Sequence, residues 1–183
     1  MLIRIIPLGN VQKHILDAVQ AELQDRLEAK CRIMEQHDIP KESFNQWRKQ
    51  YNAEAVMDSL SKSLSAKFID KDIPTLIITD MDLYYSGLNF IFGLEDPEKS
   101  SAIVSIARLK TEFYDGRPNQ QKLLERTIKE VVHEMGHYIG LDHCHNNYCV
   151  MCFSPSIQDV DTKDKNFCKE CKIKMMTKGI SMK

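Results

Sequence analysis

Two spacings of apolar residues alternate along the chain, and they predict alternating strands and helices. Short apolar or β-branched runs predict strands, whereas apolar residues four apart predict amphipathic helices that pack on a sheet. The predicted strands cover residues 2–6, 30–36, 74–79, 88–94 and 101–109. The predicted helices cover residues 11–29 and 53–68, and a third begins after Asn119, a candidate helix cap. The pattern therefore predicts an α/β fold in which helices pack on a twisted sheet.

The arrangement of the sheet follows from three of these runs. Residues 74–79 form a continuous, largely β-branched run, which is typical of a parallel strand buried on both faces. The runs at 88–94 and 101–109 are joined by a short polar turn, so these two strands are expected to pair antiparallel. We expect a mixed, mostly parallel sheet with an antiparallel edge strand.

Two further segments have ambiguous patterns. Phe44, Trp47 and Tyr51 are spaced three and four apart, and we interpret this aromatic stripe as a packing face rather than a ligand platform. Asp80 and Asp82 follow the strand at 74–79 and could bind a divalent ion. Two carboxylates without further ligands are more often turn formers, and we favour that interpretation.

Length, composition and charge narrow the class of protein. At 183 residues the chain is long enough for a single domain with a full core, which we place at residues 1–183. Its hydrophobic share of 43% and net charge of −1 give no general attraction to nucleic acid or anionic membranes. No apolar run approaches the ~20 residues that cross a bilayer, and residues 1–7 are too short and too charged for a signal peptide. We expect a cytoplasmic protein.

The candidate chemistry is concentrated in residues 133–143, which read HEMGHYIGLDH. His133 and His137 are four apart, so on a helix both imidazoles lie on one face and can bind one zinc ion. Glu134 beside them is a candidate general base. Gly140 suits a helix end at positive φ, after which the chain can return His143 as a third ligand. Three neutral protein ligands leave a fourth position open, as a catalytic zinc requires.

The alternative for this segment is a chance helix with surface histidines. Half of the chain's six histidines lie in it, and Gly140 and His143 extend HExxH at fixed offsets, so we favour the metal site. The apolar residues at 124, 128, 131, 135 and 139 form a stripe that excludes the histidines. The helix can therefore bury one side in the core and present its histidines to a cleft.

The cysteines predict a second metal site. A Cx4C…CxxC pattern is formed by Cys144, Cys149, Cys168 and Cys171. In a reducing compartment such a cluster more often holds metal than disulfides. Four thiolates complete a tetrahedron and indicate a structural zinc, which would form a C-terminal lobe at residues 144–183. We interpret Cys31 and Cys152 as small, partly buried residues without a role.

From the first histidine to the last cysteine the sequence reads HExxHxxGxxHCx4CxM, with CxxC beginning seventeen residues after Met151. At every motif position this pattern resembles the archaemetzincins, zinc metallopeptidases of the metzincin group. The resemblance implies an α+β zincin-like fold and places Met151 in a methionine turn, an apolar floor beneath the catalytic zinc. It also implies an edge strand that borders the cleft. Residues 88–93 are our candidate for it, and an ordinary core strand there is the alternative.

The expected function is zinc-dependent hydrolysis of peptide bonds in a peptide or protein substrate. On a zinc held by three imidazoles, bound water falls to a pKa near ~7, and Glu134 can pass a proton from it to the leaving amine. We expect two zinc ions per chain, one catalytic and one structural. As oxyanion donors, Tyr114, Tyr138 and Tyr148 are nearby candidates, although packing is favoured for each.

Two alternatives to a peptidase remain open. One is a catalytically weak zinc-binding module, for which nucleic acid is a disfavoured partner because acidic residues interleave with the lysines of residues 163–183. The other is a zinc hydrolase acting on a non-peptide amide.

Overall fold

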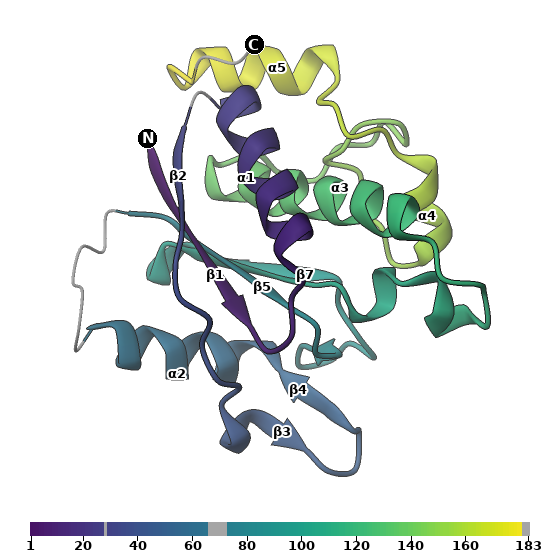
Figure 1. Cartoon of the computed structure of the whole chain (residues 1–183). Coiled ribbons are helices and arrows are strands. Elements are labelled where there is room, and N and C mark those ends of the chain that lie inside the picture. The colour runs from purple at the N-terminus through teal and green to yellow at the C-terminus, as the bar shows by residue number, and fades with distance from the viewer. Residues whose placement is uncertain (28, 66–72, 181–183) are drawn as a thin grey trace.

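The computed structural model describes residues 1–27, 29–65 and 73–180. Its central feature is a five-stranded sheet in the order β2-β1-β5-β8-β7 (Figure 1). The strands are β1 (Leu2–Leu8), β2 (Lys30–Ile33), β5 (Thr75–Thr79), β7 (Gly93–Asp96) and β8 (Ser101–Ser105). Every neighbouring pair is parallel except β7–β8, which is antiparallel and leaves β7 at the edge. The predicted α/β class and the antiparallel edge strand are confirmed.

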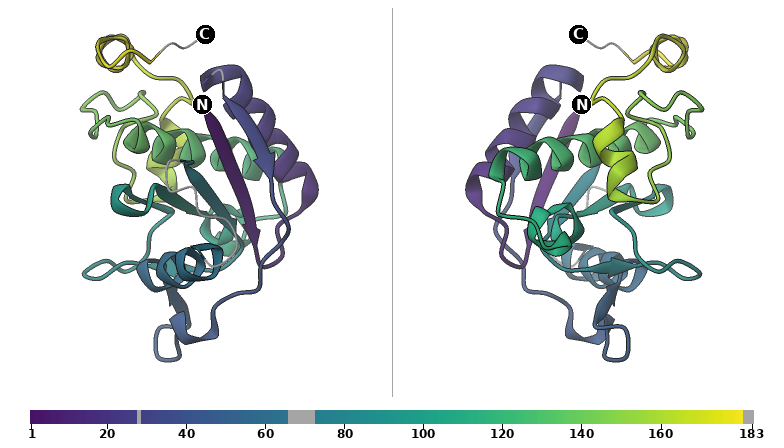
Figure 2. Two further views of the ribbon diagram at one scale, coloured as in Figure 1. Left: turned by 90° about the vertical axis from the view of Figure 1, so that its left-hand side faces the viewer. Right: turned by 90° about the vertical axis from the view of Figure 1, so that its right-hand side faces the viewer.

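Helices cover both faces of this sheet (Figure 2). On one face, α1 (Lys13–Leu27) and α3 (Gln120–Tyr138) share a core with alternate residues of the strands, such as Ile5, Ile78 and Val104. On the other face, α2 (Ala53–Ser65) packs on the intervening residues, such as Ile77 and Ile103. This alternation explains why β5 and β8 are buried along their whole length.

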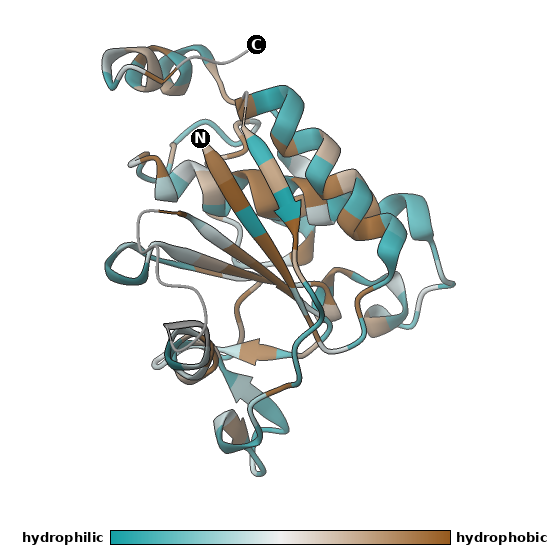
Figure 3. Ribbon diagram, turned by 60° about the vertical axis from the view of Figure 1, so that its left-hand side comes forward, coloured by the Kyte–Doolittle hydropathy of each residue, from teal (hydrophilic) through white to brown (hydrophobic). Residues whose placement is uncertain are grey.

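The helix predictions agree with these elements. In α1, the predicted apolar positions 15, 19, 23 and 27 are all buried. The expected end of α2 near residue 68 lies outside the described residues. Figure 3 shows the apolar colour continuing along β1, with one polar interruption. Within the described part of the chain, no helix combines the length and the apolar character needed to cross a membrane.

The aromatic stripe does not form one packing face. Phe44 and Tyr51 belong to a small second sheet, which comprises β3 (Phe44–Asn45), β4 (Gln50–Asn52) and β6 (Leu83–Tyr84). The rings of Phe44 and Tyr51 lie 4.8 Å apart, but Trp47 sits in the connecting turn and is 98% exposed. The helical spacing was misleading because the segment is a hairpin, whose side chains alternate with period two.

The strand predicted at residues 88–94 was also placed wrongly. Residues 85–92 form a loop of turns and bends with a single β-bridge from Ile91 to Leu83, and the edge strand begins at Gly93. The Arg48 guanidinium donates hydrogen bonds to the carbonyls of Leu88 and Asn89, so a side chain occupies acceptors that a neighbouring strand would otherwise use. Two other strands are shorter than expected, since β2 ends at Ile33 and β8 ends at Ser105.

The remaining elements are short. Four 3₁₀ turns lie at Lys41–Ser43, Pro97–Lys99, Ala107–Leu109 and Thr111–Tyr114. After α3 the chain runs without helix or strand to α4 (Ile157–Thr162), which packs beside α3, and then to α5 (Lys169–Thr177). Asp80 and Asp82 have structural partners: Asp80 accepts the Asn10 N–H, and Asp82 pairs with Arg108. Their predicted role as turn and loop residues fits these contacts.

Candidate active site and metal centres

Helix α3 carries the histidine motif at its C-terminal end. Asn119 caps its N-terminus, as the sequence predicts, and the Asn119 side chain accepts the Lys122 N–H at 2.9 Å. Its sheet-facing residues include Leu123, Val131 and Met135, all buried. The predicted stripe is buried at positions 131 and 135 and packs against the core at positions 128 and 139, but at the start of the helix Leu123 rather than Leu124 faces the core.

The turn after α3 brings the third histidine, His143, close to His133 and His137. The helix ends at Tyr138, and Gly140 has φ +84°, a conformation that costs glycine least. The Gly140 N–H donates to the His137 carbonyl at 2.7 Å. The ring of His143 then lies with its centre 4.7 Å from that of His137 and 5.4 Å from that of His133.

The three imidazoles are arranged to hold a metal ion. The Nδ1 atoms of His133 and His137 donate to the carbonyls of Val150 and Leu141, each at 2.8 Å. These bonds turn both Nε2 atoms toward one point, where they lie 3.1 Å apart. One candidate ligand atom from each ring lies within 4.8 Å of the others. Tetrahedral zinc with imidazole ligands needs nitrogens about 3.3 Å apart, so the site fits zinc.

The electrostatic environment keeps these rings neutral. Burial lowers the pKa of His133 strongly, and the positive charge of Lys163 lowers it further. Burial also lowers the pKa values of His137 and His143. Neutral imidazole is the form that binds metals, so protons compete weakly for these nitrogens near pH 7.

Glu134 lies beside the rings and against the edge strand. Its side chain is 5% exposed, and a Cβ added at Gly93 would overlap its Oε1 atom. Burial raises the pKa of Glu134 well above its usual range, and the nearby charges of Glu130 and Glu95 raise it further. The absence of a side chain at Gly93 therefore leaves room for a carboxyl group with a strong tendency to take up a proton.

These groups face a cleft of about 540 Å³. It is lined by the edge strand β7 with the turns before it, and by residues 153–155. Glu130, Glu134 and the three histidines complete the lining. On the side of β7 away from β8, no strand of the described chain pairs with it.

Met151 packs against the turn of α3 between His133 and His137. Its side chain is fully buried, and a Cβ added at Gly136 would overlap its Sδ atom. Gly136 lies between His133 and His137 on α3, so the thioether supports the turn of helix that carries both imidazoles. The Met151 carbonyl accepts the Cys144 N–H at 2.9 Å, which links this residue to the cysteine cluster.

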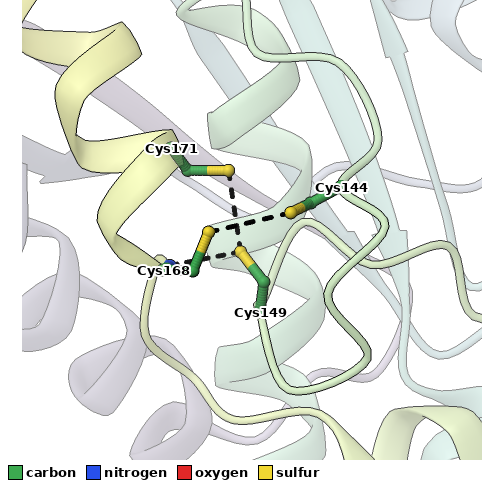
Figure 4. Close-up of side chains that lie close together, drawn as sticks. All are labelled: Cys144, Cys149, Cys168 and Cys171. Carbon is green, nitrogen blue, oxygen red and sulfur yellow. Dashed lines mark hydrogen bonds between the residues drawn. The ribbon is translucent and has the colours of Figure 1, made fainter.

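The four predicted cysteines converge between the loop after α3 and the start of α5 (Figure 4). The Sγ atoms of Cys144 and Cys168 lie 3.7 Å apart, as do those of Cys149 and Cys171. All four are free thiols. Zn–S bonds of ~2.3 Å in a tetrahedron place sulfurs about 3.8 Å apart, so this set also fits zinc. Cys152 and Cys31 are not in this cluster.

Several cleft residues were not identified from the sequence. Glu95, Glu130 and Phe153 line the cleft, and Lys163 lies behind it. Glu130 had a local signal, because it precedes Glu134 by one helical turn. The tyrosines suggested as oxyanion donors are not among the residues that line the cleft. Tyr114 donates to the Arg108 carbonyl and Tyr148 is largely exposed, so the favoured packing role is wrong for Tyr148.

Comparison with known proteins finds relatives that match nearly the whole chain. Residues 6–177 match the model of peptidase family M54. The archaemetzincin of Methanocaldococcus jannaschii is 39% identical over 180 residues, which cover 98% of this chain and 96% of the relative. The archaemetzincin of Saccharolobus solfataricus is 38% identical over 186 residues, covering 100% and 98%.

Two solved structures are similar over nearly the whole chain. The Archaeoglobus fulgidus archaemetzincin complexed with malonate has a TM-score of 0.80 at 35% identity, covering 95% of this chain and 99% of that one. A zinc-dependent peptidase from Methanocorpusculum labreanum has a TM-score of 0.84 at 31% identity, covering 94% and 99%. The chain therefore belongs to peptidase family M54, the family of the archaemetzincins, and is a zinc metallopeptidase.

Proposed function

We propose that the chain hydrolyses peptide bonds in extended segments of peptides or proteins, with Glu134 as the general base. His133, His137 and His143 would hold the catalytic zinc. The observation that carries this proposal is the convergence of three neutral imidazoles beside a buried carboxylate, in a cleft bordered by an open strand edge. Each element of that arrangement has a role in attack by water on a carbonyl.

The residues divide the chemistry between them. Zinc, when bound, supplies a Lewis acid that polarises the scissile carbonyl and acidifies water. Glu134 accepts a proton from the attacking water and then donates it to the leaving amine nitrogen, so no covalent intermediate with the chain is needed. The raised pKa of Glu134 suits both transfers, because a carboxyl group that holds its proton more tightly is a better base.

The open edge of β7 supports a peptide, rather than a non-peptide amide, as the substrate. A peptide in extended form can add to β7 through main-chain hydrogen bonds, which recognise the backbone rather than any one sequence. Gly93 lies against Glu134, so a segment paired with β7 would pass close to the general base. This favours a peptide substrate over a compact non-peptide amide.

We further propose two zinc ions per chain. Cys144, Cys149, Cys168 and Cys171 would hold the second, structural ion and so organise residues 144–183 into a C-terminal lobe of one domain. Met151 would form the apolar floor under the histidines. The lysines of this lobe are partly engaged in internal contacts: Lys163 pairs with Glu130, and Lys178 donates to the Gly140 carbonyl. Those contacts favour a structural role for the lobe over nucleic-acid binding.

Replacement of the general base tests this function. Glu134→Gln should lower the hydrolysis rate about 10²- to 10⁴-fold, the range that general acid–base catalysis contributes. Zinc content should stay unchanged, since Glu134 is not among the grouped candidate ligands. The measurements are cleavage of a quenched fluorogenic peptide library and metal analysis by mass spectrometry.

The matched control is Glu125→Gln, which makes the same change at an exposed position of the same helix. Its activity should equal that of the wild type. Undiminished cleavage by zinc-loaded Glu134→Gln would remove Glu134 from the mechanism.

A further inference from the structure

A buried ion pair joins Glu130, which lines the cleft, to Lys163, which does not. The side chains of Lys163 and Glu130 are 0% and 4% exposed, and Lys163 Nζ lies 2.9 Å from Glu130 Oε1. Apart from this ion pair, neither atom has a hydrogen-bond partner within the described residues. Lysine and glutamate are rarely buried so completely, so the pair calls for an explanation.

Stability is a poor explanation for it. The cost of removing two charges from water commonly equals or exceeds their attraction, and an apolar pair of similar volume is often at least as stable. Other contacts already fix α4 to α3. Arg126 makes two hydrogen bonds to Asp161, at 2.7 and 2.8 Å, and Lys129 Nζ donates to the Val160 carbonyl at 3.0 Å.

The position of the pair indicates its role. Glu130 lines the cleft one helical turn before Glu134, on the same side of α3. Two carboxylates at this separation repel each other, and the repulsion is strong where water is excluded. Lys163 lies behind Glu130 and is not among the residues that line the cleft. Its ammonium group is therefore placed to hold Glu130 and offset its charge without meeting the substrate.

We propose, on the basis of the peptidase function above, that Lys163 is a positioning residue for catalysis. Its ammonium group holds the Glu130 carboxylate back from the catalytic centre, so that Glu134 rather than Glu130 acts on water beside the histidines. Without Lys163, the buried Glu130 carboxylate has no counterion, and the cleft is the nearest place where it can be solvated. It would then turn toward Glu134 and the histidines and disturb both.

The experiment compares Lys163→Met, Glu130→Gln and the double variant, each loaded with zinc. Lys163→Met should lower kcat about 10- to 100-fold, as is common when a group that orients an active-site residue is lost. Its KM should change little, because Lys163 does not contact the substrate. The double variant should recover most of the lost kcat, since it has no uncompensated carboxylate. A crystal structure of Lys163→Met should show Glu130 turned into the cleft.

Asp161→Asn is the control, because it breaks another ion pair of the same α3–α4 contact away from the cleft. It should lower the melting temperature and leave kcat unchanged. An unchanged kcat in Lys163→Met, an equal loss in Asp161→Asn, or no recovery in the double variant would overturn the proposal. If the wild type cleaved no peptide, the proposed function would fail, and the crystal structure would still decide whether Lys163 positions Glu130.

Discussion

At the scale of single residues, the site depends as much on missing side chains as on reactive ones. Gly93 makes room for the Glu134 carboxylate, and Gly136 makes room for the Met151 thioether. The histidines and Glu134 were predictable because their spacing along one helix determines their geometry. The role of Gly93 was not predictable, because the contact joins residues that are distant in sequence.

The space at Gly93 can be tested by filling it with one methyl group. Gly93 does not have a positive φ, so Gly93→Ala introduces no backbone strain and acts only through the added atom. That atom would overlap Glu134 Oε1, and we expect kcat/KM to fall at least about tenfold, a loss of about 1.4 kcal/mol of transition-state stabilisation. Unfolding in urea should show a cost of about 1–3 kcal/mol, typical of overpacking.

Zinc content should be unchanged in this variant, because the three atoms nearest the added methyl group all belong to Glu134 and not to a histidine. Wild-type kinetics in Gly93→Ala would show that Glu134 can move without loss of function.

At the scale of elements, α3 contacts other parts of the protein along two of its sides. One side packs on the sheet, and a polar side, which includes Arg126, Lys129 and Glu130, contacts the segment around α4. Hydrophobic periodicity predicted the first side only, because ion pairs leave no apolar pattern in the sequence. For the same reason the sequence, which shows Lys163 as one of the lysines interleaved with acidic residues in 163–183, does not indicate that it is among the most buried side chains in the described chain.

The α3–α4 contact should show a characteristic pH dependence. Hydrogen bonds from Arg126 hold the pKa of Asp161 below its usual value, which is about 3.9 in unfolded chains. A lowered pKa in the folded state stabilises the protein above the unfolded pKa, and this contribution is lost as the pH falls through the folded pKa. The free energy of unfolding of Asp161→Asn should therefore be about 1 kcal/mol lower than that of the wild type above pH ~5, given the partial exposure of the pair.

The difference in the free energy of unfolding between Asp161→Asn and the wild type should shrink below pH ~4. Urea denaturation at several pH values measures it. A difference that stayed constant down to pH ~2 would show that the carboxylate charge of Asp161 does not stabilise the contact.

At the scale of the whole molecule, the sequence predicted the sheet, the helices that pack on it and both sets of candidate metal ligands. It did not predict residues 85–92 correctly, the connection before β7 that lines the cleft. Within residues 85–92, Leu88 and Asn89 accept hydrogen bonds from Arg48 of a hairpin distant in sequence, in addition to local backbone bonds such as that from the Ile91 N–H to the Leu83 carbonyl. The prediction for Trp47 was wrong for a related reason: Phe44, Trp47 and Tyr51 have the spacing of a helix, but they lie in a hairpin and its turn. Local spacing thus predicted the chemistry, while the walls that shape the cleft depend on long-range contacts.

Metal content tests the two-centre organisation directly. We expect two zinc ions per chain in the wild type and one in each of two double variants, His133→Ala/His137→Ala and Cys168→Ser/Cys171→Ser. The cysteine variant should also unfold at a much lower temperature, because a structural zinc contributes directly to folding. Cys152→Ser is the control and should retain both ions, since Cys152 is outside the cluster. Two zinc ions retained in either double variant would refute the corresponding site.

The bond from the Cys144 N–H to the Met151 carbonyl has a consequence for assembly. Cys144 follows His143 directly, and Met151 supports the helix turn that carries His133 and His137. Capture of an ion by the thiols would thus draw the loop closed and bring the last imidazole to its partners. If both sites take zinc, we therefore expect binding at the cysteine site to favour formation of the histidine site.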